Sequence, residues 1–156
     1  MCGIFGYISN KNSVNKSKIK RIILESKKRG RDSSGLISLD NSYEVNKIDQ
    51  NIDKLISISN FDTNIIFGHT RLITNGFSDN QPVVKDSLCA VHNGIITNPI
   101  SLWKEINRKP LLTIDSEIIV DYYDKYLNDG LEIENVTQKL IHNFEGVVCS
   151  GILFAE

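Results

Sequence analysis

Segments with a strand-like pattern lie at both ends of this chain, and segments with a helical pattern lie between them. Residues 2–8 alternate small and large apolar side chains, which is typical of a strand, and residues 146–154 are predicted to form a final strand. A chain that begins and ends in strands and places helices between them must bury the apolar face of each sheet. We therefore expect sheets covered by layers of helices.

The intervening pattern divides into further elements. Strands are predicted at residues 35–39, 43–48, 64–71 and 88–92, and helices at residues 15–29, 52–58, 100–106, 115–127 and 133–143. The clearest helix starts at residue 115, where Asp115 or Ser116 can cap its first turn. Asn93-Gly94, which follows a predicted strand, has the composition of a turn.

Composition places the chain among ordinary globular proteins. Its 156 residues are enough for one domain with a sizeable core, and 40% of them are hydrophobic. A formal net charge of -1 gives no electrostatic reason to expect nucleic acid or an acidic membrane as a partner. Three cysteines, an odd number, argue against a disulfide framework, so we expect a reduced, cytoplasmic protein. No segment resembles a signal peptide or a membrane span.

Cys2 carries the most specific chemical signal. Removal of Met1 would leave a thiol and a free α-amine on the same residue. A thiol with a pKa of roughly 8.5 needs a base at neutral pH, and an α-amine with a pKa of roughly 8 can act as one. Nucleophile and base can then come from a single residue, as in enzymes with an N-terminal threonine. Taken alone, however, Cys2 is better explained as the start of a buried strand, because a single cysteine without its partners is a weak motif.

Four polar clusters lie where predicted strands end or turns begin. They are R-G-x-D-S-S-G at residues 29–35, G-H-T-R-x-x-T-x-G at 68–76, H-N-G-I-I-x-N at 92–98 and D-S-E-I at 115–118. Each has an ordinary structural explanation, such as a solvated loop charge, a turn or a helix cap.

Together with Cys-Gly-Ile at residues 2–4 and Gln81-Pro82, these clusters occur in the order seen in a known family. Over nearly its whole length the chain resembles the glutaminase domain of the class II glutamine amidotransferases, and it is most similar to the glucosamine-6-phosphate synthases. Amidophosphoribosyltransferases come second, because they share the R-G-x-D-S and D-S-E elements. Asparagine synthetases, which usually have a different arginine motif, come third.

The resemblance implies an enzyme that hydrolyses the side-chain amide of L-glutamine to glutamate and ammonia. Cys2 would attack the carboxamide, and the side-chain amide of Asn93 with the backbone N–H of Gly94 would form the oxyanion hole. Arg71 would bind the α-carboxylate of glutamine and Asp115 its α-ammonium. Thr74 and Asn75 would also contact the substrate.

The resemblance leaves other motif residues in supporting or structural roles. Arg29, Gly30 and Asp32 match a family segment that packs around the nucleophile, and His69 and His92 are expected to be structural. No cysteine and histidine spacing fits a zinc site, and no glycine-rich loop fits a nucleotide, so no metal or cofactor is expected. Leu72 and Asn75 replace a tryptophan and a histidine that are usual in the glucosamine-synthase branch.

The implied fold is the α/β/β/α four-layer sandwich of the N-terminal nucleophile hydrolases, formed by residues 2–156 and shortened at the C-terminus. Family members normally add further strands and a synthase domain that consumes the ammonia. We therefore expect a synthase domain or subunit as partner, and an exposed strand edge that would favour association. Two alternatives remain open: a degenerate domain that binds glutamine or a protein without turnover, and an N-terminal nucleophile hydrolase for another amide.

Overall fold

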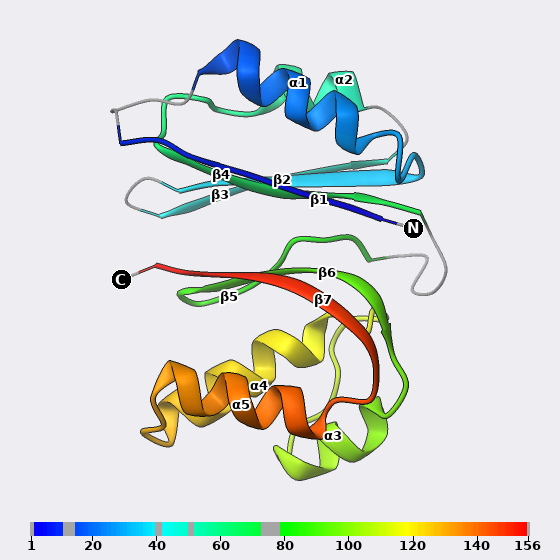
Figure 1. Ribbon diagram of the computed structural model, residues 1–156, viewed down its shortest axis with the longest axis vertical. Helices are drawn as coiled ribbons and strands as arrows, with labels where there is room; N and C mark the ends of the chain where they lie inside the picture. Colours follow the sequence, from blue (N-terminus) through cyan, green and yellow to red (C-terminus); the bar gives the residue numbers. More distant parts are fainter. Residues whose placement is uncertain (1, 11–14, 40–41, 50–51, 73–78, 156) are drawn as a thin grey trace.

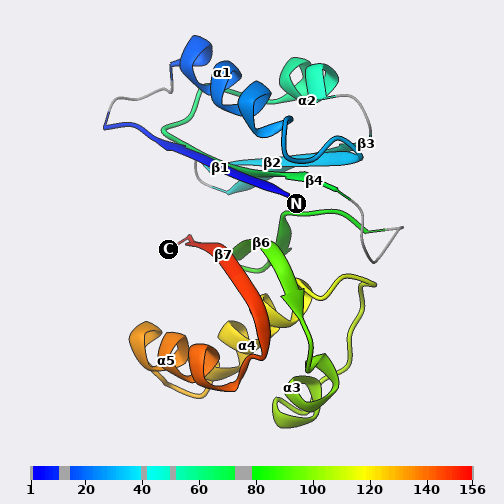
Figure 2. The same ribbon diagram turned by 45° about the vertical axis from the view of Figure 1, so that its right-hand side comes forward.

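The structure is a computed structural model that describes residues 2–10, 15–39, 42–49, 52–72 and 79–155. Two β-sheets lie face to face, and helices cover the outer face of each (Figure 1). Helices α1 and α2 lie over one sheet, and α3, α4 and α5 lie over the other. The view in Figure 2 shows the same stacking after rotation.

The first sheet has four strands in the order β1-β4-β2-β3, and every neighbouring pair is antiparallel. Its strands and covering helices are β1 (Gly3–Ile8), α1 (Lys16–Ser26), β2 (Ser33–Leu39), β3 (Tyr43–Asp49), α2 (Ile52–Ile58) and β4 (Ile65–Arg71). Strand β2 is buried along its whole length because it lies between β4 and β3 and beneath the helices. The strands and helices predicted in this half are confirmed, with bounds that differ by a few residues.

The second sheet has three antiparallel strands in the order β5-β6-β7. The elements of this half are β5 (Val83–Lys85), β6 (Leu88–Ile96), α3 (Pro99–Glu105), α4 (Glu117–Asn128), α5 (Ile133–Asn143) and β7 (Gly146–Phe154). The sequence analysis did not predict β5, whose three residues are too few for a recognisable alternation.

The helices form where the apolar spacing of the sequence predicts them. Helix α1 begins after Asn15, whose side chain accepts a hydrogen bond from the Lys18 N–H, and it buries Ile19, Ile23 and Ser26. Helix α4 is more deeply enclosed, since its first seven residues are all buried. Tyr122 of α4 is completely buried and meets Phe144 edge to face, with ring centroids 5.1 Å apart.

Each sheet has its own hydrophobic core on its helix side. Phe5, Ile19, Leu36, Leu55 and Ile66 are among the buried residues that join the first sheet to α1 and α2. A larger core joins the second sheet to the other helices; among its members are Ala90, Leu102, Ile118, Ile119, Tyr122 and Val136. The two helix-side cores therefore pack separately, one on each sheet.

The strand predicted at residues 88–92 is longer than expected, and Asn93-Gly94 does not form the turn that its composition favours. Strand β6 continues through both residues to Ile96, and Asn93 and Gly94 pair with Cys149 and Val148 of β7. Apolar residues on both sides and a long partner strand keep this polar pair within the sheet. Among the described residues, no helix is long and apolar enough to cross a membrane.

Candidate active site

Cys2 lies directly before β1 and is half-buried. The register of β1 and β4 pairs Gly3 with Thr70, so one step further it places Cys2 beside Arg71. The backbone nitrogen of Cys2 donates to Oδ1 of Asn93 over 3.1 Å, and Nε of Arg29 donates to the Cys2 carbonyl over 3.0 Å. Its Sγ lies 3.7 Å from the carbonyl oxygen of Leu72. The nucleophile candidate is therefore held from both sheets.

Asn93 and Gly94 approach Cys2 from the second sheet. Because Oδ1 of Asn93 accepts from a backbone N–H, the orientation of its amide is fixed, and Nδ2 is the side that remains to donate. Within the described part of the chain, Nδ2 has no hydrogen-bond partner. Gly94 has φ 151°, and a Cβ there would lie 1.8 Å from the carbonyl oxygen of Val147. Only glycine fits this position.

Arg71 ends β4 and is only 3% exposed. Its guanidinium donates to the backbone carbonyl of Asp79. Burial lowers the pKa of Arg71, and the charges of Cys2, Asp115 and other nearby carboxylates oppose that shift. Arginine keeps its charge under such a shift, so a permanent cation lies beside the thiol.

Asp115 lies just before α4, and its side chain is 12% exposed. It does not cap the helix: Ser116 is the N-cap residue and makes no side-chain capping bond. Instead Oδ2 of Asp115 accepts the N–H of Ile96 over 3.0 Å, which ties this carboxylate to the end of β6. Its other oxygen lies 3.9 Å from Nδ1 of His92.

The segment at residues 29–32 packs against the ends of β1 and β4. Arg29 holds the Cys2 carbonyl, and Asp32 donates its N–H to the carbonyl of Arg71 over 2.9 Å. Gly30 lies against the same strand end, where a Cβ would lie 2.5 Å from the carbonyl carbon of Arg71. These three residues therefore contact the backbone of the site residues. Thr74 and Asn75 lie outside the described residues.

Both motif histidines are buried between these elements. Burial, followed by the charge of Arg71, lowers the pKa of His69 to about 3. Burial also lowers the pKa of His92, although Asp115 opposes that shift. Neutral imidazoles at pH 7 are the consequence. Across the described residues, no three cysteine, histidine or carboxylate side chains gather as a metal site would require.

The sequence analysis missed the role of the segment just before β5. Asp79 accepts from Arg71 through its carbonyl, and its Oδ2 accepts from Thr113 N over 2.5 Å and from Thr113 Oγ1 over 2.7 Å. Gln81 is buried and bonds to the backbone of His92. In the sequence, the signal for this segment is the Gln81-Pro82 pair, a motif to which the resemblance assigns no role.

The fold is shared with a protein of known structure. The chain superposes on glutamine phosphoribosylpyrophosphate amidotransferase from B. subtilis with a TM-score of 0.72 and 18% identity, covering 98% of this chain and 34% of that one. This likeness shows that the chain shares the overall fold of that amidotransferase, which is compatible with the fold implied by the motifs.

The curated relatives are glutamine–fructose-6-phosphate aminotransferases. That of Francisella tularensis is 29% identical over 98% of this chain, and that of Sulfolobus acidocaldarius is 32% identical over 94% of it. A relative from Staphylococcus aureus is 29% identical over the whole chain. The chain spans 27% of the length of the first relative. No family model matches the chain. These relatives confirm the resemblance drawn from the motifs: the chain is a homologue of glutamine amidotransferases.

Proposed function

We propose that this chain is a glutaminase unit that hydrolyses the side-chain amide of L-glutamine to glutamate and ammonia. The observation that carries the proposal is the contact between the Cys2 backbone nitrogen and Asn93 Oδ1, 3.1 Å long. It brings the candidate nucleophile, its own nitrogen and the candidate oxyanion donor together from opposite sheets. The relatives are named glutamine–fructose-6-phosphate aminotransferases, and the glutamine in that name supports the same substrate here.

Removal of Met1 turns the Cys2 nitrogen into an α-amine that takes the thiol proton. The thiolate then attacks the carboxamide carbon, and the C–N bond breaks as the ammonium returns a proton to the leaving nitrogen. Ammonia leaves, and a Cys2 thioester remains. Water attacks the thioester, the amine accepts a proton from that water, and glutamate departs as the thiol is restored. The hydrogen bond to Asn93 fixes the direction of the amine throughout.

The tetrahedral intermediates carry negative charge on the former amide oxygen. Asn93 Nδ2, whose direction is set by the bond at Oδ1, would donate to this oxygen, and the N–H of Gly94 would be the second donor. Such donors act on charge that develops only during the reaction. In other enzymes, loss of one of them lowers the rate by roughly 10² to 10³.

Substrate recognition would use the two opposite charges beside the thiol. Arg71 would bind the α-carboxylate as a planar fork, and Asp115 would bind the α-ammonium. Thr74 and Asn75 would complete the contacts, and Arg29, Gly30 and Asp32 would hold the strand ends. A site with partners for both charged groups disfavours simple amides, because they would leave buried charges without a ligand.

The wider architecture is part of the same proposal. Residues 2–156 would form one α/β/β/α sandwich unit, and ammonia would pass to a synthase domain or subunit, as the resemblance drawn from the motifs implies. An amidophosphoribosyltransferase-like acceptor is the second candidate, since the fold matches that of such an enzyme.

The direct test is to incubate purified protein with glutamine and to measure ammonia and glutamate together. We expect equal amounts of both, and we expect Cys2→Ala to abolish turnover while the fold is retained. Turnover that survives in Cys2→Ala would refute the mechanism. Folded wild-type protein that binds glutamine and releases no ammonia would favour the non-catalytic domain.

A mass measurement identifies the nucleophile independently. A glutamine-shaped alkylating agent should add once to a protein that has lost Met1. Cys149 is exposed and lies opposite Asn93 in the β6–β7 ladder, so it is the competing thiol. Cys149→Ala should keep the single addition and Cys2→Ala should lose it; the reverse pattern would identify Cys149 as the reactive group.

A further inference from the structure

Residues 79–81, here called the bridging segment, connect parts of the site that come from different sheets. The segment holds Arg71 and Thr113 through Asp79. Nδ2 of Asn80 donates to the carbonyl of Ser34 in β2 over 3.1 Å, and its Oδ1 accepts the N–H of Gln81 over 2.8 Å. The bridging segment thus leaves the first sheet at Asn80 and reaches the second sheet at Gln81.

Gln81 is 5% exposed and makes two hydrogen bonds to one residue of β6. Its Nε2 donates to the carbonyl of His92 over 3.0 Å, and its Oε1 accepts the His92 N–H over 2.6 Å. The β5–β6 register pairs Val83 with Ala90, so its continuation would place residue 81 opposite His92. The side-chain amide of Gln81 therefore replaces the backbone pairing that β5 no longer provides.

The position of these bonds matters for the neighbouring residues. The His92 carbonyl belongs to the peptide group whose nitrogen is that of Asn93, so Gln81 fixes the plane from which Asn93 projects. Asn93 in turn accepts from the Cys2 nitrogen. The buried side-chain amide of Gln81 therefore fixes the backbone directly before Asn93. On the other edge of β6, strand β7 pairs with Asn93 and Gly94.

We propose that Gln81 is a positioning residue for the Asn93 and Gly94 donors. This inference rests on the proposed function, because it assigns Gln81 a part in the same reaction. Gln81 acts through the backbone of His92 and touches neither thiol nor substrate. Its loss should reduce the rate of the chemical step and leave glutamine binding by Arg71 and Asp115 largely intact.

The experiment compares Gln81→Leu with Tyr43→Phe. The Tyr43 hydroxyl also donates to two backbone carbonyls, those of Ser87 and Leu153, but at the far end of β6 and β7. Both substitutions remove two side-chain-to-backbone contacts, and only one of them lies next to Asn93. We expect kcat to fall about 10- to 100-fold in Gln81→Leu, with KM within about threefold, since small misplacement of reacting groups has effects of this size. Tyr43→Phe should leave kcat and KM unchanged.

A second variant, Gln81→Glu, supplies a readout that a purely structural role would not change. A carboxylate keeps the acceptor for the His92 N–H and loses the donor to the His92 carbonyl, whereas a protonated carboxyl group has both. The kcat of Gln81→Glu relative to wild type should therefore recover as pH falls from 8 to 6, because burial favours the neutral form. Gln81→Leu should show no such recovery.

Each outcome decides one point. No turnover by wild-type protein would overturn the proposed function and this inference with it. Active wild-type protein together with an unchanged kcat in Gln81→Leu would overturn the inference alone. Equal losses in Gln81→Leu and Tyr43→Phe, or no pH-dependent recovery in Gln81→Glu, would reduce Gln81 to a stability residue. Faster amide hydrogen exchange at residues 92–94 in Gln81→Leu, absent in Tyr43→Phe, would support the inference without relying on activity.

Discussion

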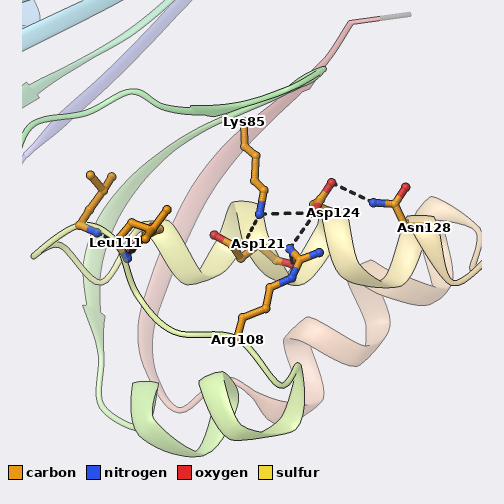
Figure 3. Close-up of polar contacts among 8 residues, drawn as sticks. Lys85, Arg108, Leu111, Asp121, Asp124 and Asn128 are labelled. Carbon is orange, nitrogen blue, oxygen red and sulfur yellow. Dashed lines mark hydrogen bonds and ion pairs between the residues drawn. The ribbon is translucent and has the colours of Figure 1, made fainter.

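Two charged regions flank helix α4 and differ in how their charges are balanced. Along the helix, Arg108 lies 2.8 Å from Asp121 and 2.7 Å from Asp124, and Lys85 pairs with the same two carboxylates (Figure 3). These four residues are here called the α4 network. Before the first turn, Asp115 is held by the N–H of Ile96 and lies near a neutral His92. The α4 network therefore contains two cations and two anions, and their charges balance.

The difference indicates what each region is for. In the α4 network, each carboxylate pairs with a cation of the same chain. These ion pairs connect β5 and the α3–α4 loop to α4. Asp115 is positioned by neutral groups, and its carboxylate lies close to the buried cation of Arg71. A zwitterionic ligand such as an amino acid could neutralise both.

The largest effect should come from a glycine substitution beside the candidate site, compared with one just after α4. Gly94 and Gly130 both have positive φ, yet a Cβ at Gly94 would collide with Val147 and a Cβ at Gly130 meets nothing within 4 Å. We expect Gly94→Ala to lower kcat by roughly 10² or more, because the oxyanion donors are displaced. Gly130→Ala should keep kcat. Turnover is compared at a temperature where circular dichroism shows both variants folded; equal kcat values would contradict the proposed oxyanion hole.

Aspartate substitutions should separate binding from stability. Asp115→Ala should raise KM for glutamine on the order of 10²-fold, because the α-ammonium loses its partner. Asp121→Asn should leave KM unchanged and lower the free energy of unfolding by about 2 kcal/mol, because Lys85 and Arg108 lose one shared carboxylate. Steady-state kinetics and urea unfolding measure the two effects. A raised KM in Asp121→Asn would remove the functional contrast between the regions.

The sequence predicted much of this arrangement, for identifiable physical reasons. Long periodic segments such as those of α1, α4 and α5 are recognisable because burial repeats at the helical period. The motifs brought Cys2, Arg71, Asn93 and Asp115 into one hypothesis, and the structure places them near one another, although their roles stay predictions.

The rest depends on contacts between residues far apart in the chain. Asn93-Gly94 has a local preference for a turn, and only pairing with β7 keeps it in a strand. Asp115 has a local preference for capping, but its carboxylate instead accepts the N–H of Ile96, nineteen residues earlier in the chain. The hydrogen bonds of Gln81 connect it to a residue eleven positions away. Local patterns contain no information about such partners.

The smallest effect concerns the buried histidines of the site region and the exposed His142 of α5. The pKa of His69 is lowered to about 3, against about 6.5 in an unfolded chain. Between these values the unfolded state binds a proton that the folded state does not, so the free energy of unfolding falls as pH drops below about 6.5. For each such group the slope approaches about 1.4 kcal/mol per pH unit. The pKa of His92 shifts in the same direction.

Chemical denaturation between pH 7.5 and 5 should show this loss of unfolding free energy. His69→Gln should reduce the slope of that free energy against pH, and His142→Gln should not. Imidazole NMR signals of His69 that titrate near pH 6.5 in the folded protein would show that this site does not exclude water.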